Sequence, residues 1–326
     1  MRLPDFDLHY PTSLEDIQGL TKKFLETGED FDFIAGGTDV LPNYKNRLNP
    51  KRQVISLSKV QGLNKISPNC IGALARVRDI AAHKELGIHF PGLVQAAKLV
   101  ASPILRNLAT LGGNLLLDTR CYYFNQSEFW RASKGYCLKA DGDECLVVPQ
   151  KEICYATYSG DLAAILLVLN AEFELHGPDG VRKIPARAFY RGDGIERFVK
   201  KPEEVLTFIH IPETQSKTRG PALKTAYRKL RARDTIEYPV MGVAMGLKTE
   251  GDRISQLEVA VTGSEAIPVW YGDLGFNGER ICQDTAEGLK KALLNRVKTY
   301  KNVPFPPGYR RSMAGEFVKE LLLTLA

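Results

Sequence analysis

Apolar and polar positions along the first 60 residues follow the order expected of a small α/β unit. Residues 14–25 have the spacing of an amphipathic helix, and Ser13 with Asp16 forms a helix-start signal just before it. Short apolar runs at 32–34 and 53–57 predict two strands. Because helix and strand alternate, we expect these strands to pair in parallel.

A second unit begins near Asn69 and is interrupted by a long irregular segment. Its pattern predicts a strand at 71–75, helices at 77–86 and 91–100, a glycine turn at 110–115, an apolar helical run after 159–161, and a hairpin of 171–176 with 181–184. Residues 119–156 show no clear periodicity. An irregular stretch of that length is uncommon in a compact domain unless it is functional or stapled.

Longer strands begin near Glu204 and indicate antiparallel pairing with terminal helices. We expect strands at 205–211, 223–230, 240–247 and 254–262, and helices near 286–297 and 315–323. The pattern therefore predicts an α+β protein in three parts. The first lobe spans 1–60, the second spans 61–215 with the irregular segment inside it, and a C-terminal domain spans 216–326.

Composition is that of an ordinary globular protein, with 44 % hydrophobic and 25 % charged residues among 326. The longest uninterrupted apolar run, 162–169, is shorter than the roughly 18 residues that a membrane helix needs. Acidic residues occupy the N-terminal stretch where a signal peptide has its apolar core, so we expect a cytoplasmic protein without a membrane partner. The net charge of +6 is interspersed and no nucleic-acid-binding motif accompanies it, so we expect no nucleic-acid partner.

Four of the six cysteines fall within 119–156, namely Cys121, Cys137, Cys145 and Cys154, separated by 15, 7 and 8 residues. A reducing cytosol disfavours disulfides. Structural zinc sites usually bring cysteines in C-x₂₋₄-C pairs, which are missing here. An iron–sulfur cluster needs four thiolates and tolerates wide spacing when a loop wraps it. The spacing favours a cluster, with zinc or no metal as the alternatives, and leaves Cys70 and Cys282 without a role.

Aromatic and basic residues accompany the four cysteines. The aromatic ones are Tyr122, Tyr123, Phe124, Phe129, Trp130 and Tyr136, and the basic ones are Arg120, Arg131, Lys134 and Lys139. An aromatic shell would exclude water from a redox centre, and the bases would offset its negative charge or dock an acidic partner. The alternative is a small aromatic core under the loop with solvated bases.

Two glycine turns, 34–40 and 110–116, differ from the G-x-G-x-x-G of a Rossmann unit. Each can present backbone N–H groups to an anion, although a Gly-Gly pair is more often only a turn. Side chains that could add hydrogen bonds to phosphate, ribose or flavin are Thr38, Asp39, Thr110 and Asn114.

Asp161 precedes the apolar run, where an aspartate ordinarily serves as a helix N-cap. Lys229, Arg231 and Arg233 alternate on a predicted strand and should share one face, which is more often an exposed edge than a ligand site. The five histidines are scattered and form no catalytic motif. We therefore predict a redox component with no catalytic residue of its own.

Motifs along nearly the whole chain resemble those of the FAD-binding subunits of the xanthine dehydrogenase family of molybdenum hydroxylases: IAGGTDVLP, ATLGGNL, SGDLAAILLVLNA and YRKLRARD. The resemblance implies a two-lobed α/β FAD-binding domain of the PCMH type, with a C-terminal domain covering the other side of the cofactor. It places the FAD diphosphate on Ala35, Gly36, Gly37, Thr38, Asp39 and Val40, and further contacts on Thr110, Gly113 and Asn114. It also places Asp161 near the flavin ring, and Lys229 with Arg233 against the cofactor from the C-terminal domain.

The cysteine-bearing insertion departs from most members and resembles that of the 4-hydroxybenzoyl-CoA reductases, a branch of this family, at DTRC, NQSE, GYCLK and CYATY. This implies a [4Fe-4S] cluster on the four cysteines, reduced ferredoxin as electron donor, a small subunit with two [2Fe-2S] clusters, a large molybdenum subunit, and a dimer of heterotrimers. Periplasmic-type aldehyde oxidoreductases also carry an extra cluster, with a cysteine spacing that we expect to differ. A flavin subunit of a hydroxylase for an aldehyde, a purine or another aryl-CoA, and a zinc-stapled binding protein, remain alternatives.

Overall fold

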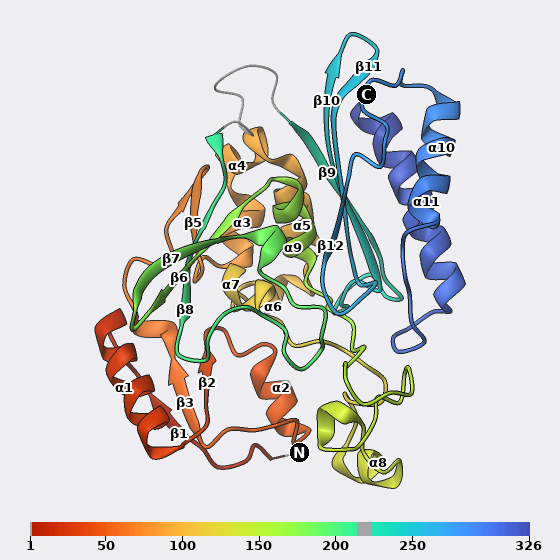
Figure 1. Cartoon of the computed structure of the whole chain (residues 1–326). Coiled ribbons are helices and arrows are strands. Elements are labelled where there is room, and N and C mark those ends of the chain that lie inside the picture. The colour runs from red at the N-terminus through yellow and green to blue at the C-terminus, as the bar shows by residue number, and fades with distance from the viewer. Residues whose placement is uncertain (1, 214–222) are drawn as a thin grey trace.

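The computed structural model describes residues 2–213 and 223–326, in which the strands form three sheets (Figure 1). The strands are β1 (Asp7–His9), β2 (Phe31–Ile34), β3 (Gln53–Ser56), β4 (Ile66–Ser67), β5 (Cys70–Gly72), β6 (Glu172–Gly177), β7 (Gly180–Pro185), β8 (Val205–His210), β9 (Lys224–Leu230), β10 (Met241–Glu250), β11 (Arg253–Thr262) and β12 (Val269–Gly272). The α-helices are α1 (Leu14–Thr27), α2 (Val40–Lys45), α3 (Val77–Ala82), α4 (Lys84–His89), α5 (Pro91–Leu99), α6 (Pro103–Arg106), α7 (Leu111–Leu115), α8 (Glu128–Ser133), α9 (Asp161–Val168), α10 (Gln283–Leu294) and α11 (Pro307–Leu325). Short 3₁₀ helices are η1 (Leu57–Lys59), η2 (Leu138–Ala140) and η3 (Ala186–Ala188).

The first sheet confirms the parallel α/β unit predicted from the N-terminal pattern. β3 lies between β1 and β2 and pairs in parallel with both. Helix α1 begins with the expected capping box: the Asp16 N–H donates to Ser13 Oγ, and the Ser13 N–H donates to the Asp16 carboxylate, each at 3.1 Å. Its apolar face buries Ile17 and Phe24 against this sheet.

The second sheet has the antiparallel order β4-β5-β8-β6-β7 and contains the predicted hairpin as β6 and β7. The helix predicted at 77–86 is wrong in one respect, because it is divided into α3 and α4. His83 ends the first helix, and its ring nitrogen accepts the N–H of Leu86 at 3.2 Å to start the second. Strand β8 belongs to this sheet, although its residues resembled the C-terminal strands in character.

The third sheet is antiparallel, in the order β12-β11-β10-β9, as the C-terminal pattern predicted apart from the short β12. Helices α10 and α11 lie side by side on one face, while α5 and α9 contact the other (Figure 1). The predicted boundary between the second lobe and the C-terminal domain, at 215–216, lies outside the described residues.

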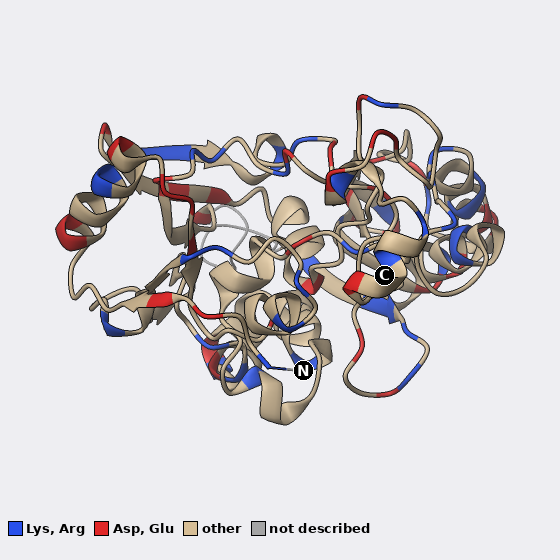
Figure 2. Ribbon diagram, turned by 90° about the horizontal axis from the view of Figure 1, so that it is seen from below, with Lys and Arg blue, Asp and Glu red and all other residues tan. Residues whose placement is uncertain are grey.

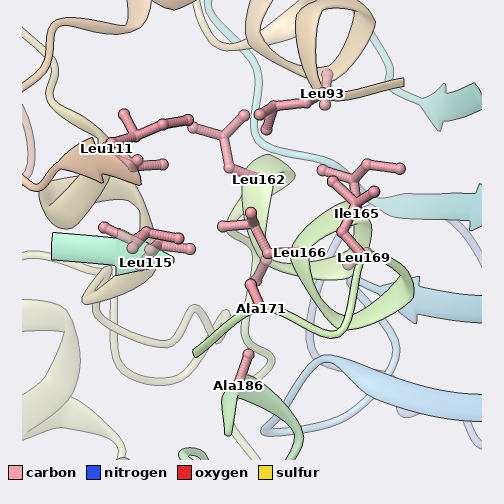
Figure 3. Packing of buried hydrophobic residues seen from close by; sticks show 14 of the residues in the cluster. Leu93, Leu111, Leu115, Leu162, Ile165, Leu166, Leu169, Ala171 and Ala186 are labelled. Carbon is pink, nitrogen blue, oxygen red and sulfur yellow. The ribbon is translucent and has the colours of Figure 1, made fainter. Parts of the chain in front are cut away.

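Helix α9 lies at the centre of the largest core, and every one of its residues is buried. Figure 3 shows side chains of α9 (Leu162, Ile165 and Leu166) and of Leu169, which follows it, beside neighbours from several elements: Leu93, Leu111, Leu115, Ala171 and Ala186. Burial of each large aliphatic side chain stabilises the fold by about 1.5–3 kcal/mol. The apolar surroundings therefore fix the position of the N-terminal residue of α9, Asp161.

The irregular segment 119–156 lies beside α2, with α8 at its outer end (Figure 1). It is closed at its base, where Arg120 and Thr157 exchange two backbone hydrogen bonds of 2.7 Å. The expectation of unbroken irregular structure was wrong at α8 and η2. Ser127 supplies the start signal for α8, because its hydroxyl accepts the N–H of Trp130 at 3.3 Å.

Charged residues of both signs alternate over the ribbon, as the sequence indicated (Figure 2). None of the helices in the described ranges combines the length and the apolar character needed to cross a membrane.

Candidate functional site

A cavity of about 390 Å³ is bordered by both glycine segments, by the start of α9, and by residues 236–238 between β9 and β10. The predicted site residues that line it are Ala35, Gly36, Gly37, Thr38, Asp39, Val40, Thr110, Gly113, Asn114 and Asp161. Segments far apart in sequence therefore meet at one hollow. Its size and mainly apolar lining with a few polar groups are typical of a cofactor site.

The first glycine turn needs its glycines for two reasons. A Cβ on Gly36 would collide with the carbonyl of Leu108, which shows how closely the turn approaches the 108–109 segment. Gly37 has a φ of +69°, which L-residues rarely adopt. The turn thus leaves backbone rather than side chains on this part of the wall, as close approach to a phosphate group requires.

The second glycine segment is helix α7, where an open turn was expected. Thr110 caps this helix, its hydroxyl accepting the N–H of Gly113 at 3.1 Å. The Asn114 side-chain oxygen accepts the N–H of Leu162 at 3.0 Å. Both residues line the cavity, and their side-chain oxygens are engaged in these hydrogen bonds within the protein. The bond of Thr110 stabilises the start of α7, and the bond of Asn114 joins α7 to α9. Direct contacts of both residues with FAD stay a prediction.

Asp161 is ion-paired inside the protein. Its carboxylate lies 3.0 Å from Lys229 Nζ and accepts the hydroxyl of Tyr227 at 3.1 Å. The two charged side chains are only 1 % (Lys229) and 3 % (Asp161) exposed. Burial raises the pKa of Asp161, and the Lys229 ammonium partly offsets that rise. The N-cap of α9 is Gly160, so the expectation that Asp161 caps the helix was wrong.

Lys229 supports the cavity wall from behind. Besides Asp161, its ammonium donates to the carbonyls of Leu99 at 2.8 Å and Glu237 at 2.9 Å. Lys229 thereby ties α5, α9 and the 236–238 wall segment together.

The two arginines after Lys229 lie outside the strand. Strand β9 ends at Leu230, so Arg231 and Arg233 do not continue one strand face with Lys229, contrary to expectation. Arg233 is exposed and its Nε donates to the carboxylate of Glu237, a cavity residue, at 2.8 Å. Its contact with the cofactor stays a prediction.

Sequence reasoning missed a part of the wall formed by Lys200, Glu204, Ile236, Glu237 and Tyr238. The Lys200 ammonium donates to the carbonyls of Lys201 at 2.7 Å and Glu204 at 2.8 Å, and burial lowers its pKa to about 8. No local motif marks these residues, because loops place them at the cavity.

The four clustered cysteines lie around a second cavity, of about 10 Å³, together with Lys139 and Phe124. All four are buried. Neighbouring backbone N–H groups partly offset the rise that burial causes in the pKa of three of the thiols: those of Tyr123 and Phe124 for Cys121, those of Lys139 and Ala140 for Cys137, and that of Ala156 for Cys154. Hydrogen bonding to cluster sulfurs is among the factors that set the potential of an iron–sulfur cluster.

Burial nevertheless favours the protonated form of three of these thiols. It raises the pKa of Cys121 to about 12 and that of Cys154 to about 11, and it also raises the pKa of Cys137. Within residues 2–213 and 223–326, no three His, Cys, Asp or Glu side chains converge closely enough to hold one metal ion. The small cavity holds about one water molecule. The structure thus brings the four cysteines together without forming a preformed single-ion site.

The accompanying aromatic and basic residues divide into two groups. Tyr123, Phe124 and Tyr136 pack with the cysteines, and Trp130 is half-buried with its ring 6.3 Å from that of Tyr123. Phe129 and Tyr122 are exposed, so the expected six-membered aromatic shell was wrong in part.

Of the four bases, Lys139 lines the cysteine cavity, and its buried ammonium donates to Asp118 and Thr119 at 2.6 Å each. Arg131 is also buried, but it donates to the backbone carbonyls of Asn46 and Arg47. It therefore anchors the loop to the first lobe.

Cys282 should be the first thiol to react in the folded chain without cofactors. Its sulfur is exposed, and hydrogen bonding with the side chain and the N–H of Thr285 lowers its pKa. The four clustered cysteines are buried, and burial raises the pKa of the half-buried Cys70. Timed alkylation at pH 7.5 with peptide mass spectrometry should show one fast site, which Cys282→Ala removes. Equal labelling of the clustered cysteines would contradict this packing.

Comparison with known proteins identifies the class. Residues 4–214 match the family described as FAD binding domain in molybdopterin dehydrogenase. The aldehyde oxidoreductase FAD-binding subunit PaoB of Escherichia coli is 33 % identical over 235 residues, covering 67 % of this chain and 71 % of that protein. The carbon monoxide dehydrogenase medium chain of Hydrogenophaga pseudoflava is 24 % identical over 325 residues, covering 98 % of this chain and 96 % of that one.

The fold agrees with that class. A chain of reconstituted CO dehydrogenase from Oligotropha carboxidovorans superposes with a TM-score of 0.77 at 23 % identity, over 100 % of both chains. A chain of quinoline 2-oxidoreductase from Pseudomonas putida 86 gives 0.76 at 21 % identity, over 100 % of this chain and 98 % of that one. The family match therefore defines an FAD-binding oxidoreductase subunit, and the superposition confirms the predicted fold class of the PCMH type. More particularly, the chain belongs to the family of FAD-binding subunits of the molybdenum hydroxylases, as its motifs indicated.

Proposed function

We propose that this chain is an electron-relay subunit that holds FAD in the 390 Å³ cavity and a [4Fe-4S] cluster on Cys121, Cys137, Cys145 and Cys154. In this proposal it works in the cytoplasm, within a 4-hydroxybenzoyl-CoA reductase that removes the phenolic hydroxyl of its substrate during anaerobic aromatic degradation. The chain receives electrons from reduced ferredoxin and passes them to a small subunit with two [2Fe-2S] clusters. A large molybdenum subunit carries out the substrate chemistry, and the assembly is a dimer of heterotrimers.

The observation that carries the cluster proposal is the convergence of four cysteines, 33 positions apart from first to last, on one small cavity lined by apolar atoms. Lys139 supplies a buried cation beside them, and backbone N–H groups partly offset the rise that burial causes in the pKa of three of the thiols. In a four-iron cluster each cysteine binds its own iron, so the sulfurs need not converge on one ion as they do around zinc. Because the cavity holds about one water, cluster insertion must move the 121–154 loop outward.

The parts of the chain that hold FAD are supported by different observations. FAD supplies the exchange between one-electron and two-electron steps when it is bound. This chain contributes close-approaching backbone at Gly36 and Gly37, and a buried carboxylate at Asp161 that is held by Lys229. These residues bind and orient the cofactor and exclude water from it. No residue of this chain is proposed to touch the thioester substrate.

The deciding experiment is anaerobic purification of the complex, followed by iron, sulfide, zinc and flavin analysis and a visible spectrum. We expect about four irons and four sulfides per chain with one FAD. Flavin without iron would exclude the cluster, and a colourless zinc protein would exclude the redox function altogether. Isolated subunit that dehydroxylated 4-hydroxybenzoyl-CoA would contradict the proposed division of labour.

A second candidate is the flavin subunit of a hydroxylase for an aldehyde, a purine or another aryl-CoA. The 33 % identity to an aldehyde oxidoreductase FAD-binding subunit favours the aldehyde among these. The substrate pocket is assigned to another subunit, so the complex itself must be assayed. Dehydroxylation of 4-hydroxybenzoyl-CoA with a reduced low-potential donor supports the first candidate, and oxidation of aldehydes with an artificial acceptor supports the second.

A further inference from the structure

Arg120 joins three parts of the chain at the edge of the FAD cavity. It immediately precedes Cys121 at the base of the cysteine-bearing loop. Its guanidinium forms an ion pair with Asp39 and donates to Asn43 at 3.2 Å and to the hydroxyl of Tyr238 at 2.6 Å. It also lies over the Tyr238 ring, with 4.3 Å from Cζ to the centroid. One side chain of the loop thus contacts the first lobe and the segment that precedes β10.

The charge of Asp39 makes this contact important for an anionic cofactor. Asp39 lines the cavity, and its carboxylate is only 16 % exposed. It accepts the Tyr238 hydroxyl at 3.1 Å and the backbone N–H of Asp118 at 3.3 Å, but neither donor carries a positive charge. The Arg120 guanidinium, 15 % exposed, is the cation paired with it among the described residues. Without Arg120, a partly buried carboxylate would face the diphosphate of FAD and repel it.

We propose that Arg120 is a positioning residue for FAD, which neutralises Asp39 and holds Tyr238 on the cavity wall. The anchoring of the cysteine-bearing loop thereby sets the affinity of the subunit for its flavin. This inference rests on the proposed placement of the FAD diphosphate along residues 35–40. It deepens the proposed function, because loop and flavin cavity are coupled even when the cluster is absent.

The test is titration of FAD into deflavinated full-length chain, followed by quenching of flavin fluorescence. We expect Arg120→Gln to raise the Kd for FAD by about 10- to 100-fold, since it leaves a carboxylate without its cation in the wall. The matched control is Arg131→Gln, which removes the other arginine that anchors this loop but contacts no cavity residue. It should lower the Tm and change the Kd by less than about threefold.

Removing the Asp39 charge as well distinguishes two explanations for weaker FAD binding by Arg120→Gln. One is the unpaired charge of Asp39, and the other is general loosening of the cysteine-bearing loop. Adding Asp39→Asn to Arg120→Gln should restore most of the affinity that the arginine variant loses, because the double variant leaves no unpaired carboxylate in the wall. Circular dichroism and the Tm of each variant show that it is folded. Equal weakening by both arginine variants, or a double variant no tighter than Arg120→Gln, would overturn the inference while leaving FAD binding intact. A wild-type chain that binds no FAD would overturn the cofactor assignment and this inference with it.

Discussion

Purified Cys137→Ala protein is expected to retain about one FAD per chain and to contain almost no iron. Cys137 lines the cysteine cavity and is the residue before η2, in the part of the loop farthest along the chain from the Arg120–Thr157 base. The flavin cavity does not include it. A [4Fe-4S] cluster needs its four thiolates, so the loss of one should abolish the cluster. Iron analysis and the visible spectrum, with flavin absorbance remaining, measure this outcome.

The controls for Cys137→Ala are the two cysteines outside the proposed ligand set. Cys70 lies in β5 and Cys282 caps α10, so alanine at either position should leave both iron and FAD unchanged. Loss of iron in either control would exclude the proposed ligand set. Loss of FAD together with iron in Cys137→Ala would show instead that the cluster staples the fold. Cys121→Ala would be harder to interpret, because Cys121 is next to Arg120 and its replacement could also affect FAD binding.

Replacing Lys229 by methionine should lower the free energy of unfolding by about 3–5 kcal/mol, because it leaves Asp161 buried without its cation. The carbonyls of Leu99 and Glu237 lose the same donor. Denaturant unfolding of the deflavinated chain measures the loss. The matched control is Lys224→Met on the same strand, where the exposed ammonium donates to the carbonyls of Leu325 and Ala326. That variant should stay within about 0.5 kcal/mol of wild type.

The deficit of Lys229→Met should also depend on pH. Burial already raises the pKa of Asp161, and loss of the ammonium that offsets it raises the pKa further. The folded state then binds a proton more tightly than the unfolded state, so stability falls as pH rises. The deficit should therefore be smaller at pH 5 than at pH 8. A deficit that is the same at both pH values, or equal stability of the two lysine variants, would contradict the role assigned to this pair.

Most of the fold could be predicted from local pattern, and the errors have identifiable causes. The predicted helix at 77–86 breaks at His83 because that side chain caps a second helix, which hydrophobic spacing does not report. The second glycine turn is α7, since Thr110 supplies a cap that turns the segment helical. Strand β8 looked like its C-terminal neighbours, but its partners β5 and β6 lie earlier in the chain. Sheet membership depends on long-range pairing, and a strand pattern alone does not contain it.

The candidate site likewise combines residues that sequence motifs predicted with residues that only tertiary contacts place there. Both glycine segments and Asp161, which short motifs mark in the sequence, line the 390 Å³ cavity, and their contacts with FAD remain predictions. The wall residues Lys200 and Tyr238 have no motif. Lys229 was expected against the cofactor, yet it lies behind Asp161, where a buried carboxylate needs a cation.

The sequence by itself determined the order of most of the longer helices and strands, the glycines of the close turn, and the gathering of four cysteines in one loop. These features follow from residue spacing and residue chemistry, which act over a few positions. Tertiary structure alone decided that the Asp39 carboxylate accepts the hydroxyl of Tyr238, 199 positions away. It also decided that the Arg120 guanidinium forms an ion pair with the same carboxylate. Such contacts form when segments distant in sequence pack together and remove a charged side chain from water. A charge buried in this way needs an oppositely charged or hydrogen-bonding group nearby in space, which can lie anywhere along the chain.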